Sequence, residues 1–320
     1  MLRNVLAYVA DLTVAAAFAA PGYRLRAPDF APLRAGDPPQ RVVVTGANAG
    51  LGLALTRQLL DAGAEVVMAC RDEARGGAAL DSLGDAGRRA RVERLDVQDL
   101  ESVAAFADRV GTIDGVVHNA GSLVHRRLAT PQGIEQTLAV HVVGPYLLTR
   151  LLAPGLATRP DPRVVFVSSG GMYGAQLDAD GMFDPPEPFD GVRAYARCKR
   201  AQVTLARLLA DEIGPRVLVA SMHPGWADTG GVRDALPRFH AVTRTFLRTP
   251  AQGADTAAWL ALAPRDAVRP GAFYLDRLPR REHMPGAATR VAPDAERALI
   301  DRLDALVAPW TGHAANRNGA

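Results

Sequence analysis

The sequence has few cysteines, little excess charge of one sign and few long uninterrupted apolar runs. Cys70 and Cys198 are its two cysteines, too few for a disulfide framework or a metal site, and they fit a reducing, cytoplasmic location. The formal net charge is +3 in 320 residues and the arginines are scattered, which argues against a nucleic-acid partner. With 48% hydrophobic and 22% charged residues, the composition predicts a chain with a sizeable buried core.

The first twenty residues are the most apolar part of the chain, but they are interrupted. They end like a signal-peptide cleavage site, yet Asp11 breaks the run and Arg3 is the one charged side chain before it. We interpret residues 1–20 as an amphipathic helix docked on the body, with peripheral membrane contact as the alternative. Residues 21–40 are rich in Pro and Gly and predict a tether.

Residues 41–310 alternate short apolar runs with helical patterns. The apolar runs predict strands at 41–45, 65–69, 91–95, 115–117, 163–167, 217–221 and 272–275. The main helical patterns lie at 51–60, 100–110, 131–152, 192–213, 251–262 and 293–307. This alternation predicts one α/β domain of the Rossmann type, a doubly wound, seven-stranded parallel sheet with helices on both faces. Residues 311–320 are predicted to be a C-terminal tail.

A glycine-rich turn, Thr-Gly-x-x-x-Gly-x-Gly, follows the first predicted strand. Glycine lets the backbone turn sharply and approach a ligand, and the start of the next helix presents free N–H groups to an anion. Between a strand and a helix, that anion is most often a dinucleotide pyrophosphate. The turn therefore predicts a cofactor site that includes Thr45, Gly46, Asn48, Gly50, Leu51 and Gly52.

Tyr195 and Lys199 are four residues apart on a predicted helix, so they share one face. A free tyrosine has a pKa near 10, and an ammonium one turn away should lower that pKa. Tyr195 would then donate a proton to a carbonyl or accept one from an alcohol. Ser169 ends a predicted strand and could hold the substrate oxygen, with backbone capping as the alternative; strand alternation points Ser168 to the opposite face.

These motifs, in this order, resemble the short-chain dehydrogenase/reductase family in its single-domain branch. The resemblance rests on the glycine turn, Asn119-Ala120-Gly121, Ser169, Tyr195-x-x-x-Lys199 and Pro224-Gly225, and it spans residues 41–275. Stretches such as Ser221-Met-His-Pro-Gly-Trp-Ala-Asp-Thr229 are most similar to retinol-dehydrogenase-type members and to the group called dehydrogenase/reductase member 12.

The resemblance implies a role for each matching residue. Tyr195 is implied to be the acid–base group, Lys199 to tune it and hold the nicotinamide ribose, and Ser169 to bind the reacting oxygen. The implied cofactor site adds to the glycine turn Asp96, Val97, Asn119, Ala120, Gly121, Pro224, Gly225 and Thr229. The implied reaction is hydride transfer between a nicotinamide and a carbonyl carbon.

His141 departs from the family pattern. The family usually has an asparagine there, three residues before a glycine, and the helix kinks so that a backbone carbonyl binds a water beside the lysine. We count His141 among the catalytic candidates because a buried histidine could add a titrating group to the proton relay. A packed histidine with an altered relay is the alternative.

The end of the second predicted strand indicates the cofactor. An NAD enzyme usually places an acidic residue there to bind the ribose 2′-hydroxyl. Here Ala69-Cys70-Arg71 ends the strand, and a guanidinium suits a 2′-phosphate. We therefore predict NADP(H), with NAD(H) as the alternative because Asp72 follows directly.

The sequence thus predicts an NADP(H)-dependent oxidoreductase that acts on a small apolar carbonyl or alcohol. Met172, Tyr173 and Trp226 are predicted to form the substrate wall, under a lid at residues 226–249. One alternative is an NADP(H)-binding sensor or scaffold with little turnover, which His141 favours. Another is a membrane-associated lipid reductase. The family implies a homodimer or homotetramer, unless the N-terminal helix covers that surface.

Overall fold

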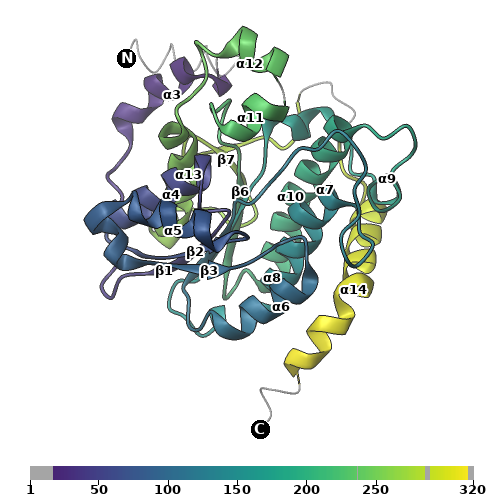
Figure 1. The fold of residues 1–320 in the computed structure, drawn as a ribbon, viewed down its shortest axis with the longest axis horizontal. Helices are drawn as coiled ribbons and strands as arrows, with labels where there is room; N and C mark the ends of the chain where they lie inside the picture. The colour runs from purple at the N-terminus through teal and green to yellow at the C-terminus, as the bar shows by residue number, and fades with distance from the viewer. Residues whose placement is uncertain (1–16, 236, 285–288, 316–320) are drawn as a thin grey trace.

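The computed structural model describes residues 17–235, 237–284 and 289–315, so most of the predicted N-terminal helix lies outside the described residues. Eight strands form one sheet in the order β3-β2-β1-β4-β5-β6-β7-β8 (Figure 1). The strands are β1 (Arg41–Thr45), β2 (Glu65–Cys70), β3 (Ala90–Arg94), β4 (Gly115–His118), β5 (Arg163–Val167), β6 (Leu218–Met222), β7 (Phe273–Leu275) and β8 (Leu278–Arg280). The strands β1 to β7 are parallel, and β8 pairs with β7 in the antiparallel direction.

Helices cover both faces of this sheet (Figure 1). The longer ones are α4 (Gly50–Asp61), α5 (Glu73–Asp81) and α13 (Pro250–Leu262) on one face and α6 (Leu100–Arg109), α8 (Gly144–Leu156), α10 (Gly191–Ile213) and α14 (Pro293–Ala315) on the other. The shorter ones are α3 (Ala20–Arg26), η1 (Ala27–Asp29), η2 (Gly84–Arg89), α7 (Gln136–Leu138), η3 (Ala139–Val143), η4 (Gly170–Gly174), α9 (Ala179–Phe183), α11 (Gly230–Ala235), α12 (Pro237–Thr243) and η5 (Arg265–Ala267).

Side-chain alternation explains why the central strands are apolar throughout. In β1, Val43 packs into the core under α6 and α8, whereas Val42 and Val44 pack into the core under α4 and α13. A parallel strand covered on both faces needs apolar residues at consecutive positions. The predicted Rossmann-type arrangement is confirmed, and the parallel direction brings the carboxyl ends of β1, β2, β4, β5 and β6 to one edge of the sheet.

Four elements differ from the prediction. The helix α3 begins at Ala20 and continues to Arg26 within the predicted tether, with a proline in its first turn, where the missing N–H has no cost. The predicted helix 131–152 begins later, at Gln136, and contains one π-helical turn, η3. The predicted tail was wrong for residues 311–315, because α14 continues past Val307 to pack Trp310 against the core. The eighth strand, β8, is short, contains Pro279 and lies at the sheet edge, so it has no apolar run.

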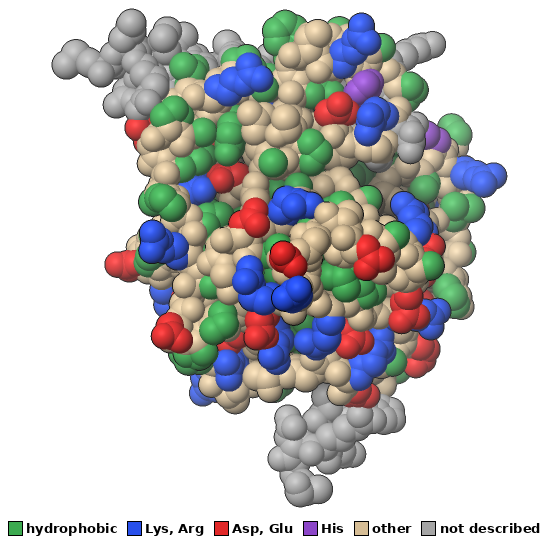
Figure 2. All heavy atoms as spheres, turned by 60° about the vertical axis from the view of Figure 1, so that its left-hand side comes forward, with side chains coloured by type: hydrophobic (Ala, Val, Ile, Leu, Met, Phe, Trp, Pro, Cys, Tyr) green, Lys and Arg blue, Asp and Glu red, His purple; other side chains and the backbone are tan. Residues whose placement is uncertain are grey.

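The described residues contain no helix long and apolar enough to cross a membrane. Within the same ranges, no three His, Cys, Asp or Glu side chains gather as metal ligands would. Figure 2 shows that basic and acidic side chains are mixed over one face of the molecule rather than collected into an area of one sign.

Candidate active site

The glycine turn after β1 has the backbone that its sequence predicts. Gly46 and Gly50 have φ angles of +67° and +54°, in the region that L side chains rarely adopt. Gly52 is constrained by space instead, since a Cβ atom there would lie 2.2 Å from the Gly46 carbonyl oxygen. Each glycine therefore lets the start of α4 approach the end of β1 with no side chain between them.

Thr45 and Asn119 join the ends of β1 and β4. The Thr45 hydroxyl accepts hydrogen bonds from the backbone N–H groups of Asn119, at 3.0 Å, and Ala120, at 2.9 Å. The Asn119 side-chain amide donates to the Thr45 carbonyl at 2.9 Å. These bonds hold the carboxyl ends of β1 and β4 together. Thr45 therefore positions the backbone around the cleft rather than lining it.

A cleft of about 520 Å³ lies along this edge. Most of the predicted cofactor residues line it: Gly46, Asn48, Gly50, Leu51, Gly52, Arg71, Asp96, Val97, Asn119, Ala120, Gly121 and Thr229. The other predicted residues, Thr45, Tyr195, Lys199, Pro224 and Gly225, are not among its lining residues. Lining residues that the sequence analysis missed include Arg75, Ser122, Gln136 and Val140.

The end of β2 presents two arginines and one carboxylate to the cleft. Arg71, Asp72 and Arg75 all line it. The Asp72 carboxylate, however, caps α5 by accepting a hydrogen bond of 3.0 Å from the Arg75 backbone N–H. One carboxylate oxygen of Asp72 therefore serves the helix, while Arg71 and Arg75 add two positive charges to this end of the cleft.

The two serines at the end of β5 face different partners, as strand alternation predicts. The Ser168 hydroxyl donates to the Lys199 carbonyl oxygen at 2.8 Å and so ties β5 to α10. The Ser169 hydroxyl accepts from the Gly171 N–H at 3.2 Å and also hydrogen-bonds the side chain of Tyr195. Ser169 is thus the serine that lies beside the tyrosine, while it also caps η4.

The expectation that Lys199 lowers the pKa of Tyr195 was wrong for this structure. Burial raises the pKa of Tyr195, and the hydrogen bond with Ser169 opposes that rise. The Lys199 Nζ atom lies 5.5 Å from the centre of the tyrosine ring and donates to the Val167 carbonyl at 2.7 Å and to Gln202 Oε1 at 2.9 Å. Burial lowers the pKa of Lys199 itself to about 7, so its charge is only partial at neutral pH.

His141 is fully buried in η3 and packs edge-on against the ring of Tyr195, with ring centres 5.2 Å apart. Its Nε2 atom lies 2.7 Å from the Ser122 carbonyl oxygen, and its Nδ1 atom has no hydrogen-bond partner among the described residues. Burial and the charge of Lys199 hold the pKa of His141 well below its usual value. A histidine that stays neutral fits the packing alternative better than a titrating relay.

Gln202 is another site residue that the sequence analysis missed. Its Nε2 atom donates to the His141 carbonyl at 2.8 Å, so its side chain links Lys199 directly to the backbone of the π-helical turn. Gln202 and Lys199 lie three residues apart in α10, which places both on one helix face. One sequence signal points here: Lys199 is the only lysine in the chain, although lysine and arginine together number 37.

The comparisons with known proteins agree with this geometry. A family model described as short chain dehydrogenase matches residues 40–238. The chain belongs to the short-chain dehydrogenase/reductase family. Members of this family are oxidoreductases, and this one is an NAD(P)-dependent enzyme acting on CH–OH and C=O groups.

Relatives within the family cover most of the chain. Dehydrogenase/reductase SDR family member 12 of Bos taurus is 38% identical over 293 residues, which span 89% of this chain and 92% of the relative. Retinol dehydrogenase 14 of Homo sapiens is 32% identical over 273 residues, spanning 76% and 81%. A solved short chain dehydrogenase of Escherichia coli CFT073, complexed with NADPH, has a TM-score of 0.62 and 25% identity over 76% of this chain and 97% of its own.

Proposed function

We propose that this short-chain dehydrogenase/reductase transfers hydride between NADP(H) and an apolar carbonyl or alcohol, with Tyr195 as the acid–base group. The observation that carries the proposal is the meeting of Ser169, Tyr195 and Lys199 at the carboxyl end of β5, beside the glycine-lined cleft. All three side chains lie within hydrogen-bond or ring contact of a neighbour in the trio. This arrangement favours a redox enzyme over a binding protein, which would not need the trio.

The cleft fits a dinucleotide. At Gly52 a side chain would collide with the backbone of the turn, and at Gly46 an added Cβ would lie 3.0 Å from Ala120 Cα, so both sites are kept open. Backbone N–H groups at the start of α4 suit a pyrophosphate. We assign the glycine turn to the pyrophosphate, Asp96 and Val97 to the adenine, and Asn119 to Gly121 to the middle of the cofactor.

Arg71 supports NADP(H) over NAD(H). It lies at the end of β2, where a dinucleotide fold binds the adenine ribose, and its guanidinium can bind a 2′-phosphate through two hydrogen bonds. Arg75 adds a second cation to the same end of the cleft. Asp72, the group that would favour NAD(H), is engaged in capping α5.

The protein groups perform the proton half of the reaction. The nicotinamide supplies or accepts the hydride when it is bound. In the reducing direction the Tyr195 phenol donates its proton to the substrate oxygen, and Ser169 holds that oxygen by a hydrogen bond. A raised pKa keeps the phenol protonated at neutral pH, which is the form that reduction requires. We assign Lys199, whose Nζ atom lies 5.5 Å from the centre of the Tyr195 ring, to the hydroxyl groups of the nicotinamide ribose.

The proposal is tested with purified protein, NADPH and a panel of apolar aldehydes and ketones. We expect turnover that Tyr195→Phe abolishes, while the variant binds NADPH as tightly as the parent chain, because the phenol oxygen is lost and the cleft is kept. Equal turnover in the variant would overturn the role of Tyr195. Tight NADPH binding with no turnover across the panel would favour the sensor interpretation, and tighter binding of NADH than of NADPH would refute the cofactor assignment.

A further inference from the structure

The first described residues, Ala17 to Ala20, lie over the same edge of the sheet as the candidate active site. All four are buried. The Phe18 carbonyl oxygen accepts a hydrogen bond of 2.8 Å from the Trp226 N–H, and the Ala20 N–H donates to the Phe246 carbonyl oxygen at 2.8 Å. The segment therefore binds both ends of the predicted lid, residues 226–249, through its backbone.

The ring of Phe18 sits among the aromatic groups of the substrate side. Its centre lies 4.3 Å from that of His223, 6.1 Å from that of Tyr173 and 6.2 Å from that of Trp226. It also lies over Gly170, where an added Cβ atom would be only 2.8 Å from Phe18 Cε2. Gly170 directly follows Ser169, so the phenyl ring is one residue from the serine that contacts Tyr195.

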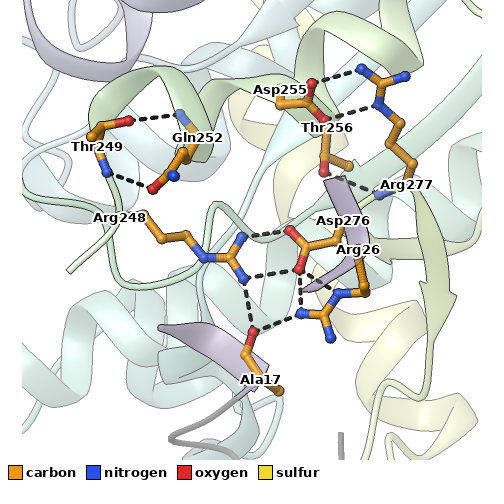
Figure 3. A network of polar contacts seen from close by, with 9 residues as sticks. All are labelled: Ala17, Arg26, Arg248, Thr249, Gln252, Asp255, Thr256, Asp276 and Arg277. Carbon is orange, nitrogen blue, oxygen red and sulfur yellow. Dashed lines mark hydrogen bonds and ion pairs between the residues drawn. The ribbon is translucent and has the colours of Figure 1, made fainter. Parts of the chain in front are cut away.

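A buried charge cluster holds this segment in place (Figure 3). Asp276 is 0% exposed and binds two arginines: Arg248, through hydrogen bonds of 2.5 and 3.0 Å, and Arg26 of α3, through a bond of 2.8 Å from its Nε atom. The guanidiniums also donate to one backbone oxygen, that of Ala17, at 2.8 and 2.9 Å. Two guanidinium groups share one carboxylate, and the partial negative charge of the Ala17 carbonyl oxygen helps to offset the excess positive charge.

A second ion pair, between Arg277 and Asp255, holds the chain near residue 31. Arg277 binds the carboxylate of Asp255 in α13 with two hydrogen bonds of 2.9 and 2.7 Å (Figure 3). It also donates to the Ala31 carbonyl at 2.6 Å. Its guanidinium also lies 4.5 Å from the centre of the Phe30 ring. Residues 17–31 are therefore held against the body at both ends, and only the Phe18 end reaches the active site.

We propose that residues 17–26 belong to the active site, where Phe18 is a specificity-determining wall of the substrate space and the Arg26–Asp276–Arg248 cluster fixes it. The assignment rests on the proposed function, since it presumes an apolar carbonyl substrate beside Ser169. The ring packs against both Tyr173 and Trp226, so we expect it to restrict the size of the group that the substrate presents there. An N-terminal segment that looks like a mere docking element thus sets substrate choice.

Two methyl ketones of different size, 2-butanone and 2-acetonaphthone, test the role of Phe18. For Phe18→Ala we expect the ratio of kcat/KM for the naphthyl ketone to that for butanone to rise about tenfold or more, the usual effect of opening a pocket by several carbon atoms. Phe30→Ala removes the same ring from the same segment but away from Ser169, and it should leave the ratio unchanged. An unchanged ratio in Phe18→Ala would overturn the assignment.

The same two ketones are also measured as ligands of the NADP⁺ complex, by equilibrium binding that needs no turnover. If the proposed function fails and nothing is turned over, the binding ratio still decides whether Phe18 limits ligand size. A rise of the naphthyl-to-butanone affinity ratio in Phe18→Ala supports the wall, and an equal ratio rejects it. The binding measurement therefore distinguishes a failure of the proposed function from a failure of the Phe18 assignment.

Hydrogen exchange tests the charge cluster independently of any substrate. Arg26→Met leaves Asp276 and Arg248 as a balanced pair, so the body should stay folded, while the Ala17 carbonyl loses one donor. We expect the Trp226 amide, which binds the Phe18 carbonyl, to exchange about tenfold faster or more, as in a locally opened segment, and the amides of β5 to exchange as before. Exchange at the parent rate for the Trp226 amide would show that the cluster does not fix the segment.

Discussion

Gln202 accepts a hydrogen bond from the buried ammonium of Lys199, so replacing it should move the pKa of Lys199 in a direction set by the new side chain. Lys199 is 4% exposed, and its ammonium donates hydrogen bonds to the Val167 carbonyl at 2.7 Å and to Gln202 Oε1 at 2.9 Å. Neither acceptor carries a charge, so burial dominates and lowers the pKa to about 7. A lysine held in this balance responds strongly to a change in one acceptor.

The size of the response follows from the contacts. In Gln202→Leu the charged ammonium loses its hydrogen bond to the amide oxygen, worth about 1.5–3 kcal/mol, which is about 1–2 pKa units and brings the pKa of Lys199 to roughly 5–6. In Gln202→Glu a carboxylate takes the place of the amide at the same short range, and an opposite charge there raises the pKa by about 1–3 units. The two variants thus move the pKa of Lys199 in opposite directions.

The measurement uses the fact that the chain has one lysine. Lysine labelled with ¹³C at Cε gives a single side-chain resonance, whose shift is followed from pH 5 to pH 10 with no substrate present. We expect a midpoint near 7 in the parent chain, below it in Gln202→Leu and above it in Gln202→Glu. A parent midpoint above 9, or equal midpoints in all three folded proteins, would refute the reasoning.

Three further predictions concern the cofactor cleft and the core. Arg71→Ala should raise the Kd for NADPH about 10- to 100-fold, the loss of a charge-assisted contact of roughly 1.5–3 kcal/mol, and leave the Kd for NADH unchanged, both measured by fluorescence titration. Gly52→Ala should abolish binding of either cofactor in the same titration, because its Cβ would lie 2.2 Å from the Gly46 carbonyl oxygen. Burial lowers the pKa of His118 to about 3, so the unfolded chain binds more protons below pH 6.5. Urea unfolding should therefore show stability lost as pH falls from 6.5 toward 3, by about 1.4 kcal/mol per pH unit from this residue, and His118→Gln should lessen that slope.

Matched substitutions serve as controls for these three. Arg88→Ala removes an exposed arginine whose partner, Asp85, lies away from the cleft, and it should not change either Kd. Gly155→Ala places a methyl group where nothing lies within 4 Å, so cofactor binding should persist. The exposed His125 gives the control for acid stability, and His125→Gln should keep the parent slope. A Kd for NADH that rises with that for NADPH in Arg71→Ala would contradict the 2′-phosphate assignment.

The positions of the inner strands β1, β2, β4, β5 and β6 could be predicted from the sequence, because burial on both faces of the sheet requires a continuous apolar run in each strand. Each of β1 to β6 lies within one residue of a predicted run. The edge strand β8 could not be predicted in this way. Its residues Leu278 and Pro279 are exposed, and a strand at the sheet edge does not need an apolar run. The glycine turn was predictable for a related reason: its φ angles and close approaches admit little else than glycine.

The contacts of Phe18, Arg26 and Gln202 were not predictable in this way. Arg26 meets Asp276 across 250 residues of sequence, and the motifs around neither residue mark the pair. Gln202 lies on a helix face whose period was visible, but its role depends on η3 having a π-helical turn that presents the His141 carbonyl. Local patterns set the elements, whereas the packing of distant elements decides which polar side chains meet.

The single lysine shows how composition and structure combine. Elsewhere this chain uses arginine for its cations, as in the Asp276 cluster, where a planar guanidinium can bind a carboxylate and a carbonyl at once and keeps its charge when buried. At position 199 the cation is buried and its two hydrogen-bond acceptors are neutral. An amine there can lose its proton near neutral pH, which an arginine cannot do. We therefore expect Lys199→Arg, which keeps a positive charge but removes the group that can lose its proton, to lower NADPH turnover on the carbonyl panel while the protein stays folded.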